Sequence, residues 1–457
     1  MTRADRSRRD AERADDEAAK EVYQGILSRS PEHDFEPTLD RVRAVCDLMG
    51  DPQKAFRTVH ITGTNGKTST ARMVDALVRE HGLRTGRFTS PHLTSPRERI
   101  AIDGEPLTAA RFVEVWQDVA PYVHMVDTRS ALDGGPRMSF FEVLTAMAFA
   151  AFADAPIDVA IIEVGMGGVW DATNVVDGEV SVITPISLDH ERWLGHDLVS
   201  IAGEKSGIIK DGATVVVSEQ HDDVEGVLLA AAAAAGARVV REGVDISVTE
   251  RTIAVGGQLI SLRGLGGVYT EVFVPLYGAH QAHNALLALV ASEALLTGGA
   301  ALDGDLVGAA FAGADSPGRL EVLRSSPTII VDAAHNPAGI EALVAGVEEA
   351  FEFTCLVGVV GVLQDKDAEA VLAGLEPLLA EIVVTRSSSP RSYDVTDLQD
   401  IAIEVFGEDR VHAVERLDDA LDLGVQLAEA AEQYGAGVLV TGSITMVADV
   451  RILLGRG

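Results

Sequence analysis

The residues best suited to chemistry lie in one short segment, Gly63-Thr64-Asn65-Gly66-Lys67-Thr68-Ser69. Its glycines leave backbone N–H groups open to an anion, and a helix that follows adds the positive end of its dipole. Lys67 supplies a full positive charge, and the hydroxyls of Thr68 and Ser69 can hydrogen-bond phosphate. The segment predicts a nucleotide site in which residues 64–69 contact ATP. The alternative is an ordinary glycine turn before a helix.

The elements around this segment favour the nucleotide site. Residues 56–62 carry Val59 and Ile61 in apolar alternation, which predicts a short buried strand. Residues 71–78 repeat apolar side chains at helical spacing, and His81-Gly82 ends that pattern. Strand, loop and helix together form a phosphate-binding unit. Because Ile61 stands where the common P-loop has its first glycine, the pattern differs from that of GTPases and motor ATPases.

A second group of candidates lies where other predicted strands end. Residues 158–164 are apolar almost throughout, which predicts a buried strand that carries Glu163 at its end. A carboxylate there costs several kcal/mol unless it is paired or bound to a metal. Ser90 follows a predicted strand at residues 87–89, so it lies on the same edge of an open sheet as the glycine segment. We therefore expect Glu163 to bind Mg²⁺, whereas Ser90 either binds it too or caps a turn.

Composition limits the classes of protein to consider. The chain has 457 residues, of which 47% are hydrophobic, which suggests two or three domains with ample cores. Its net charge of −33 argues against nucleic acid as a partner, because phosphates need Lys and Arg. The N-terminus is charged and no run of eighteen apolar residues occurs, so we expect neither a membrane span nor a secretory signal. Cys46 and Cys355 then read as reduced thiols of a cytoplasmic protein.

Further motifs follow the glycine segment in order. They are Thr89-Ser90-Pro91-His92, Ser139-Phe140-Phe141-Glu142, Glu163-Val164-Gly165-Met166-Gly167-Gly168, Asp171-Ala172-Thr173-Asn174, Leu188-Asp189-His190, Gly203-Glu204-Lys205-Ser206-Gly207, His280-Gln281, Gly318-Arg319 and Asp332-Ala333-Ala334-His335-Asn336-Pro337. This ordered set, which covers most of the chain from about Phe35 onward, resembles the folylpolyglutamate synthase/dihydrofolate synthase family of the Mur ligase superfamily. Val169 departs from the family, which usually has arginine there.

The resemblance implies an α/β fold, with a Mur-ligase-like P-loop ATPase domain built on a parallel central sheet and a smaller Rossmann-like C-terminal domain. It also implies ATP-dependent addition of L-glutamate to folates and to dihydropteroate, through an acyl phosphate. Its substrates would be small molecules, and we expect a monomer.

The resemblance also assigns roles to individual residues. The residues implied to be catalytic are Lys67, Lys205, His190 and His335, with Lys205 carbamylated, and those implied to bind two Mg²⁺ ions are Ser90, Glu163 and His190. The residues implied to contact ATP are Thr64, Asn65, Gly66, Lys67, Thr68, Ser69, Asn284, Arg319 and Asp332. Those implied to contact the pterin are Phe35, Glu36, Pro37, Thr38, Ser139, Phe140, Phe141, Glu142, Trp170, Asp171 and Ala172. For residues 35–38 a proline-marked turn is an equal alternative, and Lys205 could be an exposed lysine on a glycine turn.

The chain divides by composition. Residues 1–20 are charged and lack an apolar face, so we expect a frayed helix or a disordered tail without a function. Residues 21–312 form the predicted ATPase domain, and residues 313–318 form a linker. Residues 319–457 alternate strands with helices, which predicts a parallel layer, but they contain no dinucleotide-binding glycine fingerprint.

Two other functions remain open. A peptidoglycan Mur ligase needs a nucleotide-sugar domain ahead of the P-loop, and only about sixty residues precede Lys67, which is too few for a domain. A regulatory ATPase without ligase activity is the other alternative. The group of Glu163, His190 and Lys205 argues against it, and hydrolysis that does not depend on glutamate would favour it.

Overall fold

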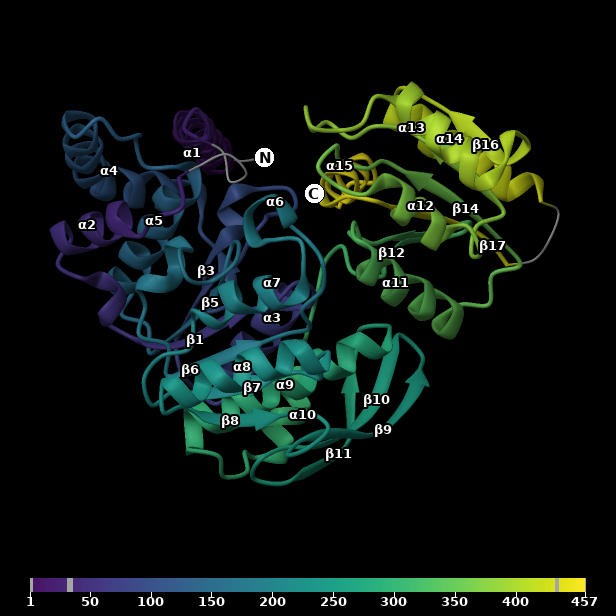
Figure 1. Ribbon diagram of the computed structural model, residues 1–457. Helices are drawn as coiled ribbons and strands as arrows, with labels where there is room; N and C mark the ends of the chain where they lie inside the picture. Colours follow the sequence, from purple (N-terminus) through teal and green to yellow (C-terminus); the bar gives the residue numbers. More distant parts are fainter. Residues whose placement is uncertain (1–2, 31–35, 432–434, 457) are drawn as a thin grey trace. The chain divides into compact units, whose positions relative to one another are not determined.

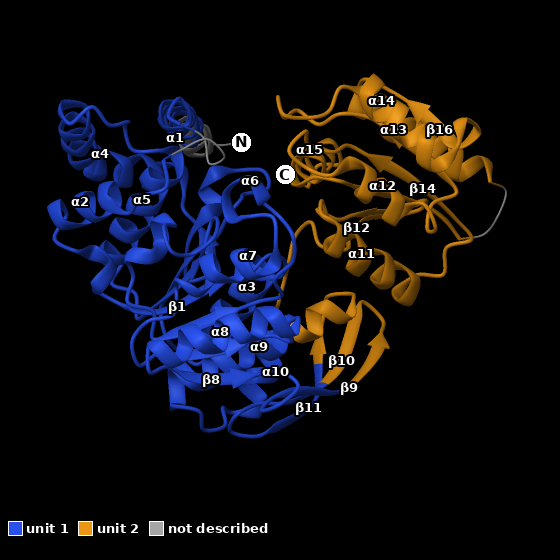
Figure 2. Ribbon diagram, in the orientation of Figure 1, with its two compact units in different colours: residues 1–249, 261–272, 284–313 blue, residues 250–260, 273–283, 314–457 orange. Residues whose placement is uncertain are grey.

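A computed structural model describes residues 3–30, 36–431 and 435–456, with side chains from residue 11 onward. The chain divides into two compact units (Figure 2). Unit 1 comprises residues 1–249, 261–272 and 284–313, and unit 2 comprises residues 250–260, 273–283 and 314–457. The sequence analysis placed one boundary at residues 313–318. The units do change there, but residues 250–260 and 273–283 also group with unit 2 because of their packing.

Unit 1 is built on an eight-stranded sheet with the strand order β4-β3-β2-β5-β1-β6-β7-β8 (Figure 1). The strands are β1 (Arg57–Thr62), β2 (Thr85–Phe88), β3 (Ile100–Ile102), β4 (Glu105–Pro106), β5 (Val159–Glu163), β6 (Val180–Ile183), β7 (Thr214–Val217) and β8 (Arg238–Arg241). Strands β2, β5, β1, β6, β7 and β8 run parallel, whereas β3 and β4 pair antiparallel at one edge. The predicted parallel centre is therefore confirmed.

Helices cover the sheet because each buries an apolar stripe against it. In unit 1 they are α1 (Arg3–Leu27), α2 (Asp40–Leu48), α3 (Lys67–Glu80), α4 (Ala109–Leu132), α5 (Phe140–Asp154), α6 (Glu191–Leu194), α7 (Leu198–Ser206), α8 (Asp222–Ala234), α9 (Ala279–Thr297, whose first turn belongs to unit 2) and α10 (Gly304–Ala312), with the 3₁₀ turns η1 (Pro52–Lys54), η2 (Pro96–Arg99) and η3 (Ala172–Val175). One core joins α1, α2, α4 and α5 to Ala160 and Ile162 of β5. A second joins α7 and α8 to Val215 and Val217 of β7.

The sequence left a frayed helix or a disordered tail open for residues 1–20, and residues 3–20 form the first turns of a helix. Helix α1 runs without a break from Arg3 to Leu27. Only its C-terminal turns reach the core, where Ala19 and Ile26 are buried and Val22 packs beside them. The charged first turns lack an apolar face, as the sequence indicated, but they extend a helix that the core has already nucleated.

Three short strands follow the first sheet. They are β9 (Ser247–Ala254), β10 (Gly257–Arg263) and β11 (Val268–Val274), in the order β11-β10-β9. Glu293 of α9 holds the turn between the last two strands, since its carboxylate accepts hydrogen bonds from the N–H groups of Leu265 and Gly266 and from the hydroxyl of Tyr269. Burial raises the pKa of Glu293, while these hydrogen bonds act to lower it.

Unit 2 contains a six-stranded sheet with the order β12-β13-β17-β14-β15-β16. Its elements are β12 (Glu321–Ser325), β13 (Thr328–Val331), α11 (Pro337–Ala350), β14 (Cys355–Val360), α12 (Ala368–Leu375), β15 (Glu381–Val384), α13 (Val395–Phe406), η4 (Glu408–Arg410), β16 (Val411–Ala413), α14 (Leu417–Ala430), β17 (Ala436–Thr441) and α15 (Ile444–Leu453). All neighbours except β12 and β13 pair in parallel, which confirms the Rossmann-like layer. Within the described part of the chain, no helix is both long enough and apolar enough to cross a membrane.

A buried ion pair joins α3 to β2. The carboxylate of Asp75 accepts a hydrogen bond of 2.6 Å from the guanidinium of Arg87 and one of 2.5 Å from the hydroxyl of Thr85. The side chain of Asp75 is 0% exposed and that of Arg87 is 5% exposed. Removal of one partner from such a pair leaves an uncompensated buried charge.

We expect Asp75→Ala to destabilise unit 1 by about 3 to 5 kcal/mol, because the Arg87 guanidinium then lacks its buried carboxylate. Urea unfolding followed by tryptophan fluorescence measures this, since Trp116, Trp170 and Trp193 all belong to unit 1. Glu179→Ala is the control. It removes a partner of Arg57 from a pair whose side chains are 45% and 46% exposed, so a loss below about 1 kcal/mol is expected. Equal losses in both variants would contradict the analysis.

Candidate functional site

The carboxyl ends of four neighbouring strands bring the predicted site together. β1 lies between β5 and β6, and Ile61 pairs with both Glu163 and Val182. β2 lies on the far side of β5, so Ser90 follows at the same edge. Parallel strands present their carboxyl ends on one edge, where open α/β sheets bind ligands. The geometry therefore places the glycine segment, Glu163 and Ser90 together, as the sequence predicted.

The glycine segment forms a tight loop that ends at the first turn of α3. Gly66 caps the helix in a left-handed conformation (φ 90°), and no side chain caps it. The first N–H groups of α3 are therefore not used by a cap, which suits an anion. A Cβ atom on Gly66 would lie 2.4 Å from the amide oxygen of Asn284, so α9 packs directly against the loop. This contact brings the predicted nucleotide residue Asn284 to the site.

Two backbone N–H groups of the loop form hydrogen bonds to the segment that follows β6. The N–H groups of Thr64 and Asn65 donate to the carbonyl oxygen of Pro185, at 2.9 and 3.4 Å. The hydroxyl of Thr64 donates to the carbonyl of Ser187 at 3.0 Å. The segment after β6 thus supports the loop from behind, a contact that the sequence analysis missed. Backbone contacts of this kind leave no sequence signal.

Two lysines meet at one carbonyl oxygen. Lys67 Nζ donates to the Gly63 oxygen at 3.1 Å, and Lys205 Nζ donates to the same oxygen at 2.7 Å. Lys205 is 4% exposed, so it is not the exposed lysine that the sequence left open. Burial, and then repulsion by Lys67, lower the pKa of Lys205 to about 7. A substantial fraction of neutral amine is therefore present at this position near neutral pH.

Glu163 is 1% exposed, and its carboxylate accepts hydrogen bonds from a hydroxyl group and a backbone N–H group. The hydroxyl of Thr68 donates to both carboxylate oxygens, at 2.9 and 3.0 Å, and the N–H of Ser90 donates to one of them at 3.3 Å. The Glu163 carboxylate and the Thr68 hydroxyl beside it supply oxygen atoms, which are the ligands that Mg²⁺ prefers. Thr68 was predicted to contact phosphate alone, and its contact with Glu163 was not predicted.

His190, the third predicted metal ligand, differs from the buried Ser90 and Glu163 in its exposure. His190 is exposed and precedes α6 in a left-handed conformation (φ 53°). Over the described residues, no group of three or more His, Cys, Asp or Glu side chains lies close enough to hold a metal ion. The second Mg²⁺ ion and the catalytic role of His190 therefore stay predictions.

The first turn of α5 holds four predicted pterin residues, Ser139 to Glu142. Ser139 and Glu142 form a capping box, in which the N–H of Ser139 donates to Glu142 at 2.6 Å. Arg41 of α2 also donates to this carboxylate at 3.1 Å and to Glu36 at 2.9 Å. Arg41 thus ties the segment of Glu36, Pro37 and Thr38 to α5. Phe35 lies outside the described residues.

The other predicted pterin residues lie after β5. The carboxylate of Asp171 accepts hydrogen bonds from the N–H groups of Met166 at 2.8 Å and Thr173 at 2.9 Å. Burial raises the pKa of Asp171, and these hydrogen bonds act against that rise. Because Met166 lies within the glycine turn of residues 165–168, its bond to Asp171 holds that turn in shape. Trp170 and Ala172 flank Asp171 in sequence. The pterin role of these residues stays a prediction.

Three predicted residues belong to unit 2. Asp332 follows β13 and accepts hydrogen bonds from the N–H groups of Leu320 and Ala334, both at 2.8 Å. Burial raises the pKa of Asp332, whereas the positive charge of Arg319 acts to lower it. His335 bonds the carbonyl of Ala333 through Nδ1 at 2.8 Å. Asp332 therefore organises the segment that carries Arg319 and His335, and their nucleotide and glutamate roles stay predictions.

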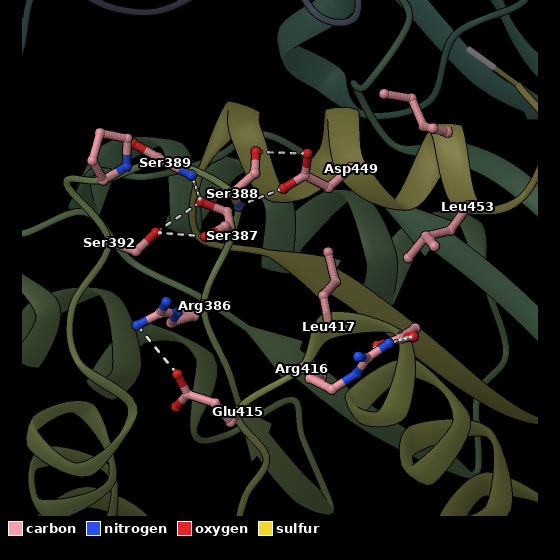
Figure 3. A pocket seen from close by; sticks show the side chains of 13 residues that line it. Arg386, Ser387, Ser388, Ser389, Ser392, Glu415, Arg416, Leu417, Asp449 and Leu453 are labelled. Atoms are coloured by element: carbon pink, nitrogen blue, oxygen red, sulfur yellow. Dashed lines mark hydrogen bonds and ion pairs between the residues drawn. The ribbon is translucent and has the colours of Figure 1, made fainter.

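Unit 2 contains a cavity of about 570 Å³ that no sequence motif indicated, and Figure 3 shows the side chains that line it. It lies beyond the ends of β15 and β16 and is lined by Arg386, Ser387, Ser388, Ser389, Pro390, Ser392, Glu415, Arg416, Leu417, Asp418, Asp449, Ile452 and Leu453. Its charged side chains have partners: Arg386 contacts Glu415 at 3.2 Å, and Asp449 accepts a hydrogen bond from the hydroxyl of Ser388. None of the predicted site residues lines it.

Comparison with known families and proteins agrees with this architecture. The Mur ligase middle domain matches residues 124–292, and the Mur ligase glutamate ligase domain matches residues 318–444. A dihydrofolate synthase/folylpolyglutamate synthase of Mycobacterium tuberculosis is 51% identical over 448 residues, which cover 94% of this chain and 92% of that protein. The protein of the same name from Bacillus subtilis is 31% identical, over 91% of this chain and 94% of its own length.

Solved structures extend the similarity to the whole fold. Mycobacterium tuberculosis folylpolyglutamate synthase, solved with ADP and AMPPCP, has a TM-score of 0.92 at 50% identity over 97% of this chain and 99% of that one. Escherichia coli FolC, solved with DHPP and ADP, has a TM-score of 0.81 at 27% identity over 96% and 97% of the two chains. The chain therefore belongs to the dihydrofolate synthase/folylpolyglutamate synthase family of the Mur ligase superfamily, and it is an ATP-dependent ligase that adds L-glutamate to folates.

Proposed function

We propose that this ligase accepts dihydropteroate as well as reduced folates, and that it uses ATP with Mg²⁺. The observation that carries the proposal is the edge of the unit 1 sheet. There, two lysines and a buried carboxylate with its hydroxyl partners surround one phosphate-binding loop. The names of the relatives, which include both synthase activities, support the choice of substrates.

The chemistry explains why this set of groups is needed. A carboxylate resists attack by an amine, because it is negatively charged and a poor acyl donor. Transfer of the γ-phosphoryl group from ATP to the carboxylate oxygen gives an acyl phosphate and ADP. The amine of glutamate then attacks the acyl carbon, the amide forms, and phosphate leaves. Two anions must come into contact, so fixed positive charge has to offset their repulsion.

Residues of this chain can meet those needs. Lys67 and the N-terminus of α3 would hold the phosphates, and Thr68 and Ser69 would hydrogen-bond them. Glu163, with the hydroxyls of Thr68 and Ser90, would hold Mg²⁺, which neutralises charge on the phosphate oxygens when bound. Among the remaining predictions, Asn284, Arg319 and Asp332 would contact the nucleotide, and His335 would meet the incoming glutamate.

The direct test is phosphate release from ATP in the presence of L-glutamate and either dihydropteroate or tetrahydrofolate. We expect release only when both an acid and glutamate are present, because the acyl phosphate forms on one and is consumed by the other. Lys67→Ala serves as a control for contaminating ATPases, since it removes a phosphate-binding charge.

Two other outcomes of this assay would contradict the proposal, in different ways. Equal phosphate release without acid or glutamate would overturn the ligase mechanism and favour a regulatory ATPase. Activity with tetrahydrofolate but not with dihydropteroate would refute the broader substrate range and leave the family assignment in place.

We infer that Lys205 is carbamylated in the active enzyme. The neutral amine attacks CO₂ and loses a proton, which leaves a carbamate anion. A pKa of about 7 provides that amine at neutral pH, whereas a free lysine, with a pKa of about 10.4, provides little. The carbamate would add negative charge beside the phosphate loop, where it could support a second Mg²⁺ directly or through water.

Lys205→Ala should lose ligation, and short carboxylic acids should restore part of it by replacing the missing anion. With a pKa of about 7, Lys205 is mostly ammonium below that pH and mostly neutral amine above it. Because only the neutral amine reacts with CO₂, activation of the wild type by bicarbonate should rise from about pH 6 to about pH 8. Lys54→Ala, which changes an exposed lysine paired with Asp51, should show the same activation by bicarbonate as the wild type and should gain nothing from the carboxylic acids. A bare ammonium in electron density, with activity independent of bicarbonate, would refute the carbamate.

Gly63→Ala should weaken ADP binding by about ten- to hundredfold, as expected for overpacking that costs about 1–3 kcal/mol. An added Cβ would lie 1.9 Å from the hydroxyl oxygen of Thr184 and 2.8 Å from its carbonyl oxygen, so the loop must move. Titration calorimetry measures the affinity. Gly226→Ala in α8, which meets nothing within 4 Å, is the matched control and should bind normally. Normal binding by Gly63→Ala would contradict the phosphate role of the loop.

A further inference from the structure

Four side chains from three segments form a closed ring of contacts that includes the predicted pterin residue Phe140. The ring of Tyr23, from α1, meets the ring of His92 edge-on at 5.9 Å and that of Phe140 at 6.0 Å. Arg99 donates from Nε to His92 Nδ1 at 2.8 Å. Its guanidinium lies 5.2 Å from the centre of the Phe140 ring. We call Tyr23, His92, Arg99 and Phe140 the aromatic cluster.

The chemistry of the aromatic cluster fixes the orientation of His92. Arginine is always a donor, so Nδ1 of His92 must be the acceptor and the neutral ring carries its proton on Nε2. Arg99 is 3% exposed and stacks on Phe140, so its position is set by burial as well as by the hydrogen bond. Tyr23 closes the arrangement from the side of α1.

The segment between Ser90 and Arg99 is held as one piece. The carboxylate of Glu98 accepts hydrogen bonds from the N–H groups of Leu93, Thr94 and Ser95 at 2.9, 2.9 and 2.7 Å. Burial acts to raise the pKa of Glu98, but these bonds and that from the Thr94 hydroxyl outweigh it and lower the pKa. These bonds join residues 93–95, which directly follow His92, to Glu98, which directly precedes Arg99.

Helix α1 meets this segment at a second point, where Arg97 lies 3.6 Å from Asp16. That pair is partly exposed, with side chains 32% and 54% accessible, so it contributes little energy. The contacts of the Tyr23 ring are the stronger connection. They reach Phe140 and the residue two places after Ser90, which are a predicted pterin contact and a predicted metal ligand.

We propose that Tyr23 is a positioning residue for the pterin-bearing substrate. Its ring holds Phe140 and the segment that begins at Ser90 in the arrangement that binds the pterin. The proposal rests on the proposed function, because it needs the pterin to bind beside Phe140. It gives α1, which the sequence analysis left without a function, a part in substrate binding.

The test compares Tyr23→Ala, Tyr23→Phe and Val22→Ala for KM and for direct dihydropteroate binding by calorimetry with ADP present. Tyr23→Ala should raise the KM and Kd for dihydropteroate about tenfold and leave the KM for ATP within about twofold. Tyr23→Phe keeps the ring and should match the wild type. Val22→Ala removes packing from the same helix without a ring contact to His92, and it should also leave both constants unchanged.

The outcomes separate the two proposals. Unchanged dihydropteroate affinity in Tyr23→Ala, or a parallel rise in the KM for ATP, would overturn the positioning role. A Tyr23→Phe variant as weak as Tyr23→Ala would overturn it too, because the hydroxyl rather than the ring would then matter. A wild-type protein that binds dihydropteroate but does not ligate it would refute the proposed function alone.

Discussion

The carbonyl oxygen of Gly63 accepts hydrogen bonds from two lysines, and much of unit 1 is arranged around that point. The shared acceptor holds the Lys67 ammonium and the Lys205 amine close together in a protein of net charge −33, and repulsion by Lys67 helps to lower the pKa of Lys205. The arrangement also needs a glycine, because the backbone at Gly63 has a φ of 142° and lies against Thr184. Positive charge is thus concentrated where the global field would otherwise repel anions.

The strand order explains how distant residues reach this point. β1 carries the loop, β5 delivers Glu163, β2 leads to Ser90, and β6 leads to the segment that supports the loop. Lys205 arrives from α7, whose glycine-rich surroundings allow close packing: a Cβ on Gly168 would lie 2.5 Å from the carbonyl of Glu204. The site is therefore a property of the sheet edge rather than of any one motif.

The sequence predicted those parts of the site that depend on local pattern. Glu163 stood out because an apolar strand ended in a carboxylate, and the structure buries it as expected. The N–H groups of Thr64 and Asn65 could not be assigned in this way, since their partner is a backbone carbonyl more than a hundred residues away. For Asn284 only the family resemblance pointed to the loop. For α1 the sequence left a frayed helix or a disordered tail open, because the packing of its last turns against the core is a tertiary contact.

The division of the chain has a consequence for anyone who wishes to dissect it. The backbone passes between the two units five times, after residues 249, 260, 272, 283 and 313. A cut at the compositional linker would therefore release neither unit whole, because residues 250–260 and 273–283 would remain on the wrong fragment. Circular permutants or inserted reporters would face the same restriction in this region.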